Sequence, residues 1–412
     1  MTTYSPQPTL LLNSVALSDD VIINDISVNM GRANILEQPS PGYARVDLWT
    51  GGDDPIDVAL SQPLQIKIQT PSNGAVSIFN GIVSDIEIKL SGFGNAGSLT
   101  IYTLTAVGPL ASLNKKVAGF SGFPEEFDGT RILKILTEAF LVEWDDIATN
   151  LTWAQLPAET TWESYDGVNN TLVANLTDDI DVPGVYELTA YTGGDANSVT
   201  LTTNAAQSGR GVLSEHGDGS LHYDDYLARI DFDQLLLTQD DILSAGLETA
   251  SQWSEIVNDV FVNYGSGEAI ARDETSIFLY GQLTGTRETD LLHLADAQSQ
   301  AQQFLESRAY PRTYPTTFTI PLHSSTVTNS TRDVLAAVYC GLPITTNDLP
   351  AVFGTTFQGY VEGWSWRIRE KEAYLQLTTS SLEETYPNII WYQLPTGMSW
   401  ADYPADQRWE DI

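Results

Sequence analysis

The segment Phe79-Asn80-Gly81-Ile82-Val83 decides how this chain is interpreted, because its pattern returns late in the sequence as Phe357-Gln358-Gly359-Tyr360-Val361. Each copy leads into a run of alternating apolar residues and is followed by Leu-Thr, at 104–105 and at 377–378. A glycine at the same place in both copies predicts a bulge or a close backbone approach. We therefore expect two β domains of similar build, with these corresponding motif positions: Phe79, Gly81, Val83, Phe357, Gly359 and Val361.

The rest of the chain follows a β pattern with one interruption. Short runs of Val, Ile, Leu and Thr between Gly, Pro, Asn and Asp fill residues 9–116 and return after residue 230, which is typical of half-buried antiparallel strands. In between, residues 130–141 and 166–176 carry apolar residues at helical spacing. Asp128 is the expected cap of the first of these helices.

These patterns predict a mainly β fold with an α+β insertion, in which two tube-like β-barrel domains flank an α+β domain. We expect the first barrel at residues 1–116, the insertion domain at 117–230 and the second barrel at 231–388. The second barrel should contain a strand at 275–280 and a helix at 287–309. Residues 389–412, with Trp spaced between Pro and Gly, should form an extended C-terminal arm.

A second internal repeat is shared by the middle of the chain and this arm. Residues 153–165 and 391–403 share Trp, Gln, Leu, Pro, Trp and Tyr at identical spacing, and a further Trp follows at 409. The first copy is interpreted as a turn fixed by proline whose aromatics cover their own core. The second copy lies in a segment too extended for a core, and exposed Trp gives much contact area at low entropic cost. We predict that the arm docks on a partner subunit through Trp391, Leu394, Pro395, Trp400, Tyr403 and Trp409.

The charge balance argues against tight nucleic-acid binding. The chain of 412 residues has 19 basic and 54 acidic residues, a net charge of −35, whereas a protein that neutralises phosphates needs clustered Lys and Arg. The acidity fits solubility or a saline habitat, and it equally fits a surface past which DNA slides. Cys340 is the one cysteine, which excludes an internal disulfide framework and suits a reducing cytosol. Neither a signal peptide nor a membrane segment is expected.

The sequence contains no recognisable catalytic motif, so no enzyme activity is predicted. The sequence has no Gly-x-Ser-x-Gly elbow, no His-Glu-x-x-His helix and no Walker loop. A hydrolase built from two carboxylates stays an open alternative in so acidic a chain, and Glu125 and Glu126 beside Phe127 are one place to look for it.

One cluster has a metal-like composition. His216 and His222 lie close in sequence to several acidic residues, namely Asp218, Asp224 and Asp225. A hairpin over residues 211–226 explains the cluster more simply, with the two histidines on either side of a polar turn. We therefore expect neither a metal nor a cofactor.

Five stretches, in this order, make the chain resemble the tail hub family of long-tailed phages, whose members are also described as minor tail or baseplate hub proteins. The likeness covers most of the chain. The stretches are Phe79-Asn80-Gly81-Ile82-Val83-Ser84-Asp85-Ile86, Leu104-Thr105-Ala106-Val107-Gly108-Pro109-Leu110, Phe127-Asp128-Gly129-Thr130-Arg131-Ile132-Leu133, Trp253-Ser254-Glu255-Ile256-Val257-Asn258-Asp259-Val260 and Phe357-Gln358-Gly359-Tyr360-Val361-Glu362-Gly363-Trp364.

The resemblance implies a homotrimer in which each subunit gives two tube-like barrels, so that three chains form a ring of pseudo-sixfold symmetry. Such a ring would join the sixfold tail tube protein or distal tail protein to a threefold tail tip or fibre protein. DNA and the tape-measure protein would only pass through its lumen, where an acidic wall would let the polyanion slide. The implied location is the tail tip of the virion, after assembly in the host cytoplasm.

A host-surface module that binds carbohydrate is the alternative of a different class. Such a module would stack its many aromatic side chains on sugars and would place them on one exposed face. A hub would instead divide its aromatics between the barrel cores and the C-terminal arm.

Overall fold

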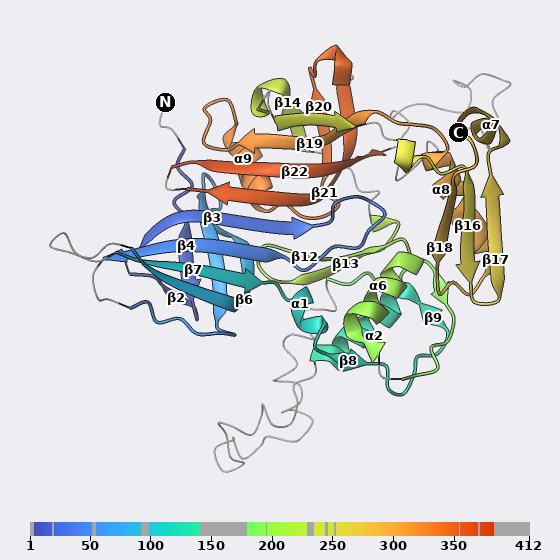
Figure 1. The fold of residues 1–412 in the computed structure, drawn as a ribbon, viewed down its shortest axis with the longest axis horizontal. Helices are drawn as coiled ribbons and strands as arrows, with labels where there is room; N and C mark the ends of the chain where they lie inside the picture. The colour runs from blue at the N-terminus through green and yellow to red at the C-terminus, as the bar shows by residue number, and fades with distance from the viewer. Residues whose placement is uncertain are drawn as a thin grey trace, which may run out of the picture.

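The computed structural model describes residues 4–18, 20–51, 55–91, 99–140, 179–194, 196–228, 235–243, 246–250, 253–353, 355–369 and 371–382. Within these ranges the chain is mainly β, as predicted, and its largest element is a sheet of 13 strands (Figure 1). The predicted helix at 166–176, the first Trp motif at 153–165 and the C-terminal arm at 389–412 lie outside the described residues.

The 13-stranded sheet joins strands from both predicted barrels. We call β1–β7 the N-terminal half-sheet; its strands are β1 (Thr9–Leu12), β2 (Val15–Ala16), β3 (Ile22–Gly31), β4 (Tyr43–Gly51), β5 (Pro63–Thr70), β6 (Gly74–Ser91) and β7 (Leu99–Val107). The remaining strands form the C-terminal half-sheet: β14 (Leu235–Thr238), β15 (Leu247–Ala250), β19 (Tyr314–Pro321), β20 (Pro343–Asn347), β21 (Thr356–Ile368) and β22 (Ala373–Ser381). The halves meet where β21 pairs with β3, so the strand order runs β15-β19-β22-β21-β3-β4-β7-β6-β5-β1-β2.

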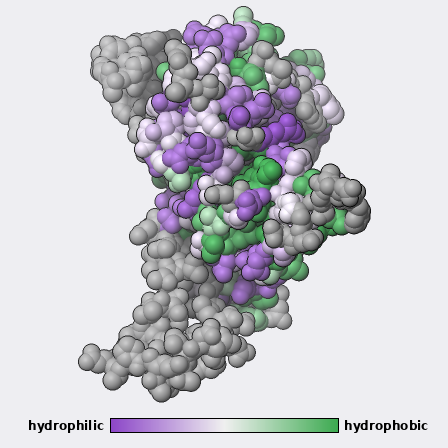
Figure 2. Space-filling view, turned by 90° about the vertical axis from the view of Figure 1, so that its left-hand side faces the viewer, coloured by the Kyte–Doolittle hydropathy of each residue, from purple (hydrophilic) through white to green (hydrophobic). Residues whose placement is uncertain are grey.

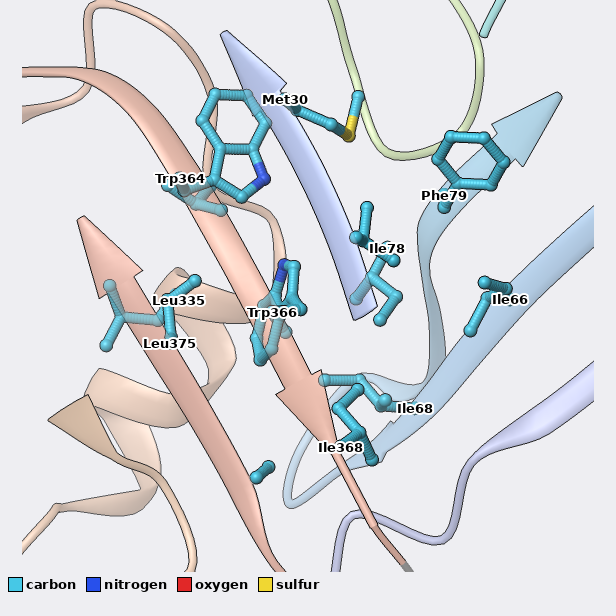
Figure 3. Packing of buried hydrophobic residues seen from close by; sticks show 14 of the residues in the cluster. Met30, Ile66, Ile68, Ile78, Phe79, Leu335, Trp364, Trp366, Ile368 and Leu375 are labelled. Carbon is cyan, nitrogen blue, oxygen red and sulfur yellow. The ribbon is translucent and has the colours of Figure 1, made fainter. Parts of the chain in front are cut away.

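The two half-sheets share one hydrophobic core. Alternate residues of the central strands are fully buried, as in Val46 of β4, Leu104 of β7 and Leu375 of β22. Figure 3 shows Trp366 and Ile368 of β21 beside Ile68 of β5, and α9 (Asn329–Ala336) adds Leu335. Within the described residues of this single chain the strands form an open sheet, and no closed barrel is present.

A second core lies between the insertion region and a small sheet further along the chain. The insertion supplies α1 (Leu110–Leu113), α2 (Asp128–Phe140), α6 (Ser198–Ser208) and the short strands β8 (Val117–Ala118), β9 (Glu126–Phe127), β10 (Glu187–Leu188), β11 (Ala196–Asn197), β12 (Val212–Glu215) and β13 (Leu221–Asp224). The small sheet consists of β16 (Asp259–Tyr264), β17 (Gly267–Arg272) and β18 (Thr284–Glu288), and α8 (Leu294–Arg308) packs on it. Leu136, Ala206, Val260 and Ala301 bury their side chains together here.

Three local expectations are wrong. Residues 275–280 form a helix, α7 (Glu274–Tyr280), because the Asp273 side chain caps it by accepting a hydrogen bond from the Ser276 backbone N at 2.8 Å. Helix α8 begins at Leu294 rather than 287, because the residues before it pair with β16 as strand β18. The Asp128 carboxylate faces the core of the insertion, where it accepts hydrogen bonds from Tyr186 and Tyr223, in place of the expected cap.

Other local expectations are confirmed. The helix expected at 130–141 is α2, and the hairpin expected at 211–226 is the β12–β13 pair. In the described part of the chain, no helix is long and apolar enough to cross a membrane.

Candidate assembly surface

The two Phe-x-Gly-x-Val segments occupy matching places in their half-sheets. In β6, Gly81 pairs with Leu64 of β5, the residue after Pro63; in β21, Gly359 pairs with Ile344 of β20, the residue after Pro343. A Cβ on Gly81 would lie 2.3 Å from the Val107 carbonyl O, and one on Gly359 would lie 2.0 Å from the Ser380 carbonyl O. A methyl group does not fit at either distance, so the backbone approach requires glycine.

A β-bulge follows at the same distance from each glycine. The register shifts between Val83 and Asp85 in β6, and between Val361 and Gly363 in β21. Val83 donates its backbone N–H to the Gln62 carbonyl O at 2.9 Å, and Val361 donates to the Leu342 carbonyl O at the same distance. The half-sheets are therefore built on one plan, down to the bulge that bends the long strand.

One face of the central sheet is lined mainly by polar side chains, because strand residues alternate between the core and the other side. The pairing registers place these side chains on neighbouring strands of the same face, which we call the polar face. Its members are Asp25, Ser27, Asn29, Arg45, Asp47, Asp85, Glu87, Lys89, Thr103, Thr105, Thr317, Thr319, Ser365, Arg367 and Gln376. Tyr43, Trp49, Ile101 and Tyr374 lie on the same face.

The cations of the polar face are all paired with carboxylates. Arg45 Nε lies 3.7 Å from Asp47 Oδ1, Lys89 Nζ lies 2.9 Å from Glu87 Oε1, and Arg367 Nε lies 3.8 Å from Asp25 Oδ1. These pairs are partly exposed and contribute little stability. They do neutralise the positive charges that would otherwise bind phosphate. Asp25 is shared with a further cation, because Arg369 Nε lies 3.0 Å from Asp25 Oδ1.

A buried ion pair between Glu362 and Arg32 connects the two half-sheets. Glu362, the extra residue of the β21 bulge, is fully buried; its Oε2 lies 2.5 Å from Nε of Arg32, which follows β3. Its other oxygen accepts a hydrogen bond from Ser380 Oγ. The corresponding bulge residue of β6 is Ser84, which is exposed. Neither partner of this pair was singled out from the sequence, because the contact joins residues 330 positions apart.

A buried carboxylate holds the insertion against the N-terminal half-sheet. Glu215, the last residue of β12, accepts hydrogen bonds from the backbone N–H groups of Gly42 and Leu110. Burial raises the pKa of Glu215 to about 7, although these two hydrogen bonds oppose the shift. Burial likewise raises the pKa of Asp128 to about 6. Both groups are structural anchors of the insertion, since each is enclosed by the chain.

The predicted histidine cluster is a stacked pair across a hairpin turn. The rings of His216 and His222 lie 3.5 Å apart and nearly parallel. Burial, together with the charge of His222, lowers the pKa of His216 to about 4, so the two rings stack in the neutral state at pH 7. Among the described residues no three His, Cys, Asp or Glu side chains are arranged to hold a metal ion.

Of the two carboxylates considered for hydrolysis, Glu125 is exposed and Glu126 lies next to two cations. Glu126 is buried, with Oε1 3.4 Å from Arg131 Nε and with Lys134 on its other oxygen. Its position is therefore that of a structural ion pair at the start of α2.

Four arginines gather in a cavity of about 50 Å³ between the central sheet and the second core: Arg32, Arg210, Arg287 and Arg308. Burial, together with the nearby charges of Arg210 and Arg32, lowers the pKa of Arg287 to about 10. The Arg287 guanidinium lies over the Phe304 ring, 5.3 Å from its centroid. Since the chain has only 19 basic residues, this clustering leaves the outer surface more acidic than the composition suggests.

Several large aromatic side chains are buried in the cores. Trp366, Tyr223, Tyr360, Phe79 and Phe318 rank among the largest fully buried residues. The most exposed aromatics that the structure describes belong to separate elements, as for Phe278 in α7 and Phe120 in a loop. Figure 2 shows one face of the molecule, on which green hydrophobic patches lie between purple hydrophilic ones.

No family model matches the chain, and no curated protein sequence matches it. Several solved structures match nearly its whole length, among them two tail proteins. The 43 kDa tail protein of prophage MuSo2 from Shewanella oneidensis is 10% identical, with a TM-score of 0.57, and the match covers 92% of this chain and 98% of that one. The tail protein from Neisseria meningitidis MC58 is 12% identical, with a TM-score of 0.57 and coverage of 93% and 98%. The chain therefore has a phage-tail-type fold, which confirms the predicted resemblance at the level of the fold.

Proposed function

We propose that this chain is a structural tail hub protein: a homotrimeric ring at the tail tip of a virion. The observation that carries the proposal is the internal repeat, in which β6 and β21 share the glycine approach and the bulge. Because each chain carries two equivalent half-sheets, three chains present six equivalent units. A ring of this kind can meet a sixfold tail tube or distal tail protein on one side and a threefold tip or fibre protein on the other.

The polar face is the proposed lining of the ring's channel. DNA passes through a channel without binding to its lining when the lining has no free cations, because phosphate contacts dominate protein–DNA affinity. Arg45, Lys89 and Arg367 are each paired, and the net charge of −35 adds long-range repulsion. The tape-measure protein would pass the same wall before the DNA. The most exposed described aromatics, such as Phe278 and Phe120, lie on separate elements and not on one face, which favours this function over carbohydrate binding. The proposal includes no enzyme activity.

The C-terminal arm at 389–412 is proposed to dock on a neighbouring tail protein through its Trp residues. The arm is separate in sequence from both half-sheets, so its loss should leave the ring intact and weaken attachment to the tail.

Electron microscopy and native mass spectrometry of the purified chain test both proposals. We expect a ring with a central channel and a mass of three 45.1 kDa chains. A chain without residues 391–412 should form the same ring and fail to enter tails. A monomer without a channel would contradict the hub, and normal tail assembly by the shortened chain would contradict the docking arm.

A further inference from the structure

The outer part of β6 is the structural counterpart of a strand segment that is buried in the other half-sheet. After the bulges, Ile86 lies opposite Leu104 of β7, as Trp364 lies opposite Leu377 of β22. The register continues in step, so Ile88 corresponds to Trp366, Lys89 to Arg367 and Leu90 to Ile368. Both segments alternate apolar and polar residues in the same phase.

The burial of these matched residues is opposite. Trp366 and Ile368 are 1% and 0% exposed, whereas Ile88 and Leu90 are 58% and 51% exposed. The difference has a visible cause. Residues 363–368 of β21 pair with β22 on one edge and with β3 on the other, while residues 85–91 of β6 pair with β7 alone among the described strands. An unpaired edge with exposed apolar side chains is a site for adding a strand.

The internal repeat identifies which strand would fit. Val46 of β4 and Phe318 of β19 correspond, because they lie opposite the matched residues Leu104 and Leu377. Strand β3 pairs with β4 through Ile26 and Val46, and β15 pairs with β19 through Leu247 and Phe318. The counterpart of β3 in the C-terminal half-sheet is therefore β15, which is the end strand of the 13-stranded sheet.

We propose that residues 85–90 of β6 pair antiparallel with β15 of a second copy of this chain, as β21 pairs with β3 within one chain. In β21 and β3, Ile368 lies opposite Ile26 and Arg367 lies opposite Ser27. The same register places Leu90 opposite Leu247 of the second copy. It also places Lys89 opposite Glu248, which is exposed, so the contact has opposite charges where the internal junction has Arg367 and Ser27.

This inference rests on the proposed ring and specifies its contact. The two surfaces differ, so the association is head-to-tail and closes only when a rotation returns the last copy to the first. Each contact covers Ile88 and Leu90 of one chain and satisfies the free edge of β15 in the next. The sheet would then continue around the ring, with every junction built like the one between β21 and β3.

Disulfide trapping tests the register. Leu90→Cys combined with Leu247→Cys places two thiols on directly opposed strand residues, whose spacing fits a disulfide. We expect cross-linked dimers and trimers on a non-reducing gel after mild oxidation. The matched control pairs Leu90→Cys with Thr249→Cys; Thr249 directly follows Glu248 in β15, so its expected partner in β6 is Ile88. That control offsets the thiols by two strand residues, or about 7 Å along the strand, and should not cross-link.

Charge reversal tests the contact without cysteines. Lys89→Glu and Glu248→Lys should each lower the fraction of ring at least tenfold at low salt, and the double variant should restore it. If the wild-type chain forms a ring but the Leu90–Leu247 pair gives no cross-link and charge reversal has no effect, this contact is wrong and the proposed function survives. A wild-type chain that forms no ring contradicts the proposed function and this contact with it.

Discussion

Strands β6 and β21 follow the same plan, yet they end in different surroundings. Both carry a glycine in close contact with the backbone of the neighbouring strand, then a bulge, then three apolar residues that alternate with polar ones. In β21 those residues fill the shared core, because β3 lies along the strand. In β6 two of them face outward. A local pattern therefore sets the shape of the strand, and the neighbouring strand decides whether its side chains serve stability within one chain or contact between chains.

The largest expected effect comes from substitutions at two matched positions, Trp366 in β21 and Ile88 in β6. Trp366→Ala should lower the free energy of unfolding of the isolated chain by about 3–5 kcal/mol, because it empties a fully buried site. Ile88→Ala should change it by about 0.5 kcal/mol or less and should weaken ring formation instead. Urea unfolding and native mass spectrometry of both variants check this. Equal losses of stability would show that the outer part of β6 is covered within the chain.

The bulge residues offer a second matched pair. Glu362→Gln should cost about 3 kcal/mol of unfolding free energy, because it leaves Arg32 buried without its charge partner. Ser84→Ala, at the same place in β6, should stay within about 0.5 kcal/mol of the wild type. Chemical denaturation of the two variants measures the difference. A loss below about 1 kcal/mol in Glu362→Gln would mean that the halves are held together without this ion pair.

A smaller effect is expected from Glu215, whose raised pKa makes the free energy of unfolding depend on pH. Glu215 is bound by two backbone N–H groups, and burial raises its pKa to about 7 in the folded chain from an ordinary 4.5. The folded chain then binds more protons than the unfolded chain between these pH values. The free energy of unfolding should therefore fall as pH rises from about 4.5 to 7, by on the order of 2 kcal/mol from this group.

Glu215→Gln isolates that contribution. Thermal or urea unfolding from pH 5 to pH 8 should show a weaker pH dependence in the variant than in the wild type. The change in net charge of the remaining carboxylates, including Asp128, is common to both proteins and cancels in the comparison. Parallel pH profiles would contradict the raised pKa of Glu215.

The sequence predicted the elements whose signals are local. The periodic helix at α2 and the hairpin of β12 and β13 are predicted from spacing and turn residues alone. It misassigned α7, where a single cap at Asp273 outweighs a strand-like composition. It also placed the start of α8 too early, because the parallel pairing of β18 with β16 is a tertiary contact. The polar face could be expected only in part, since alternation reveals polar positions and not which strands lie side by side.

The sequence by itself determined that the chain is mainly β, acidic, and built on a repeated Phe-x-Gly-x-Val plan, because strand alternation, charge and glycine spacing are properties of short segments. Only the tertiary structure decided that β21 pairs with β3, that Glu362 meets Arg32, and that Ile88 and Leu90 stay exposed. Those outcomes depend on which distant strands share an edge. The identical local pattern is compatible with a covered edge in one half-sheet and an open edge in the other.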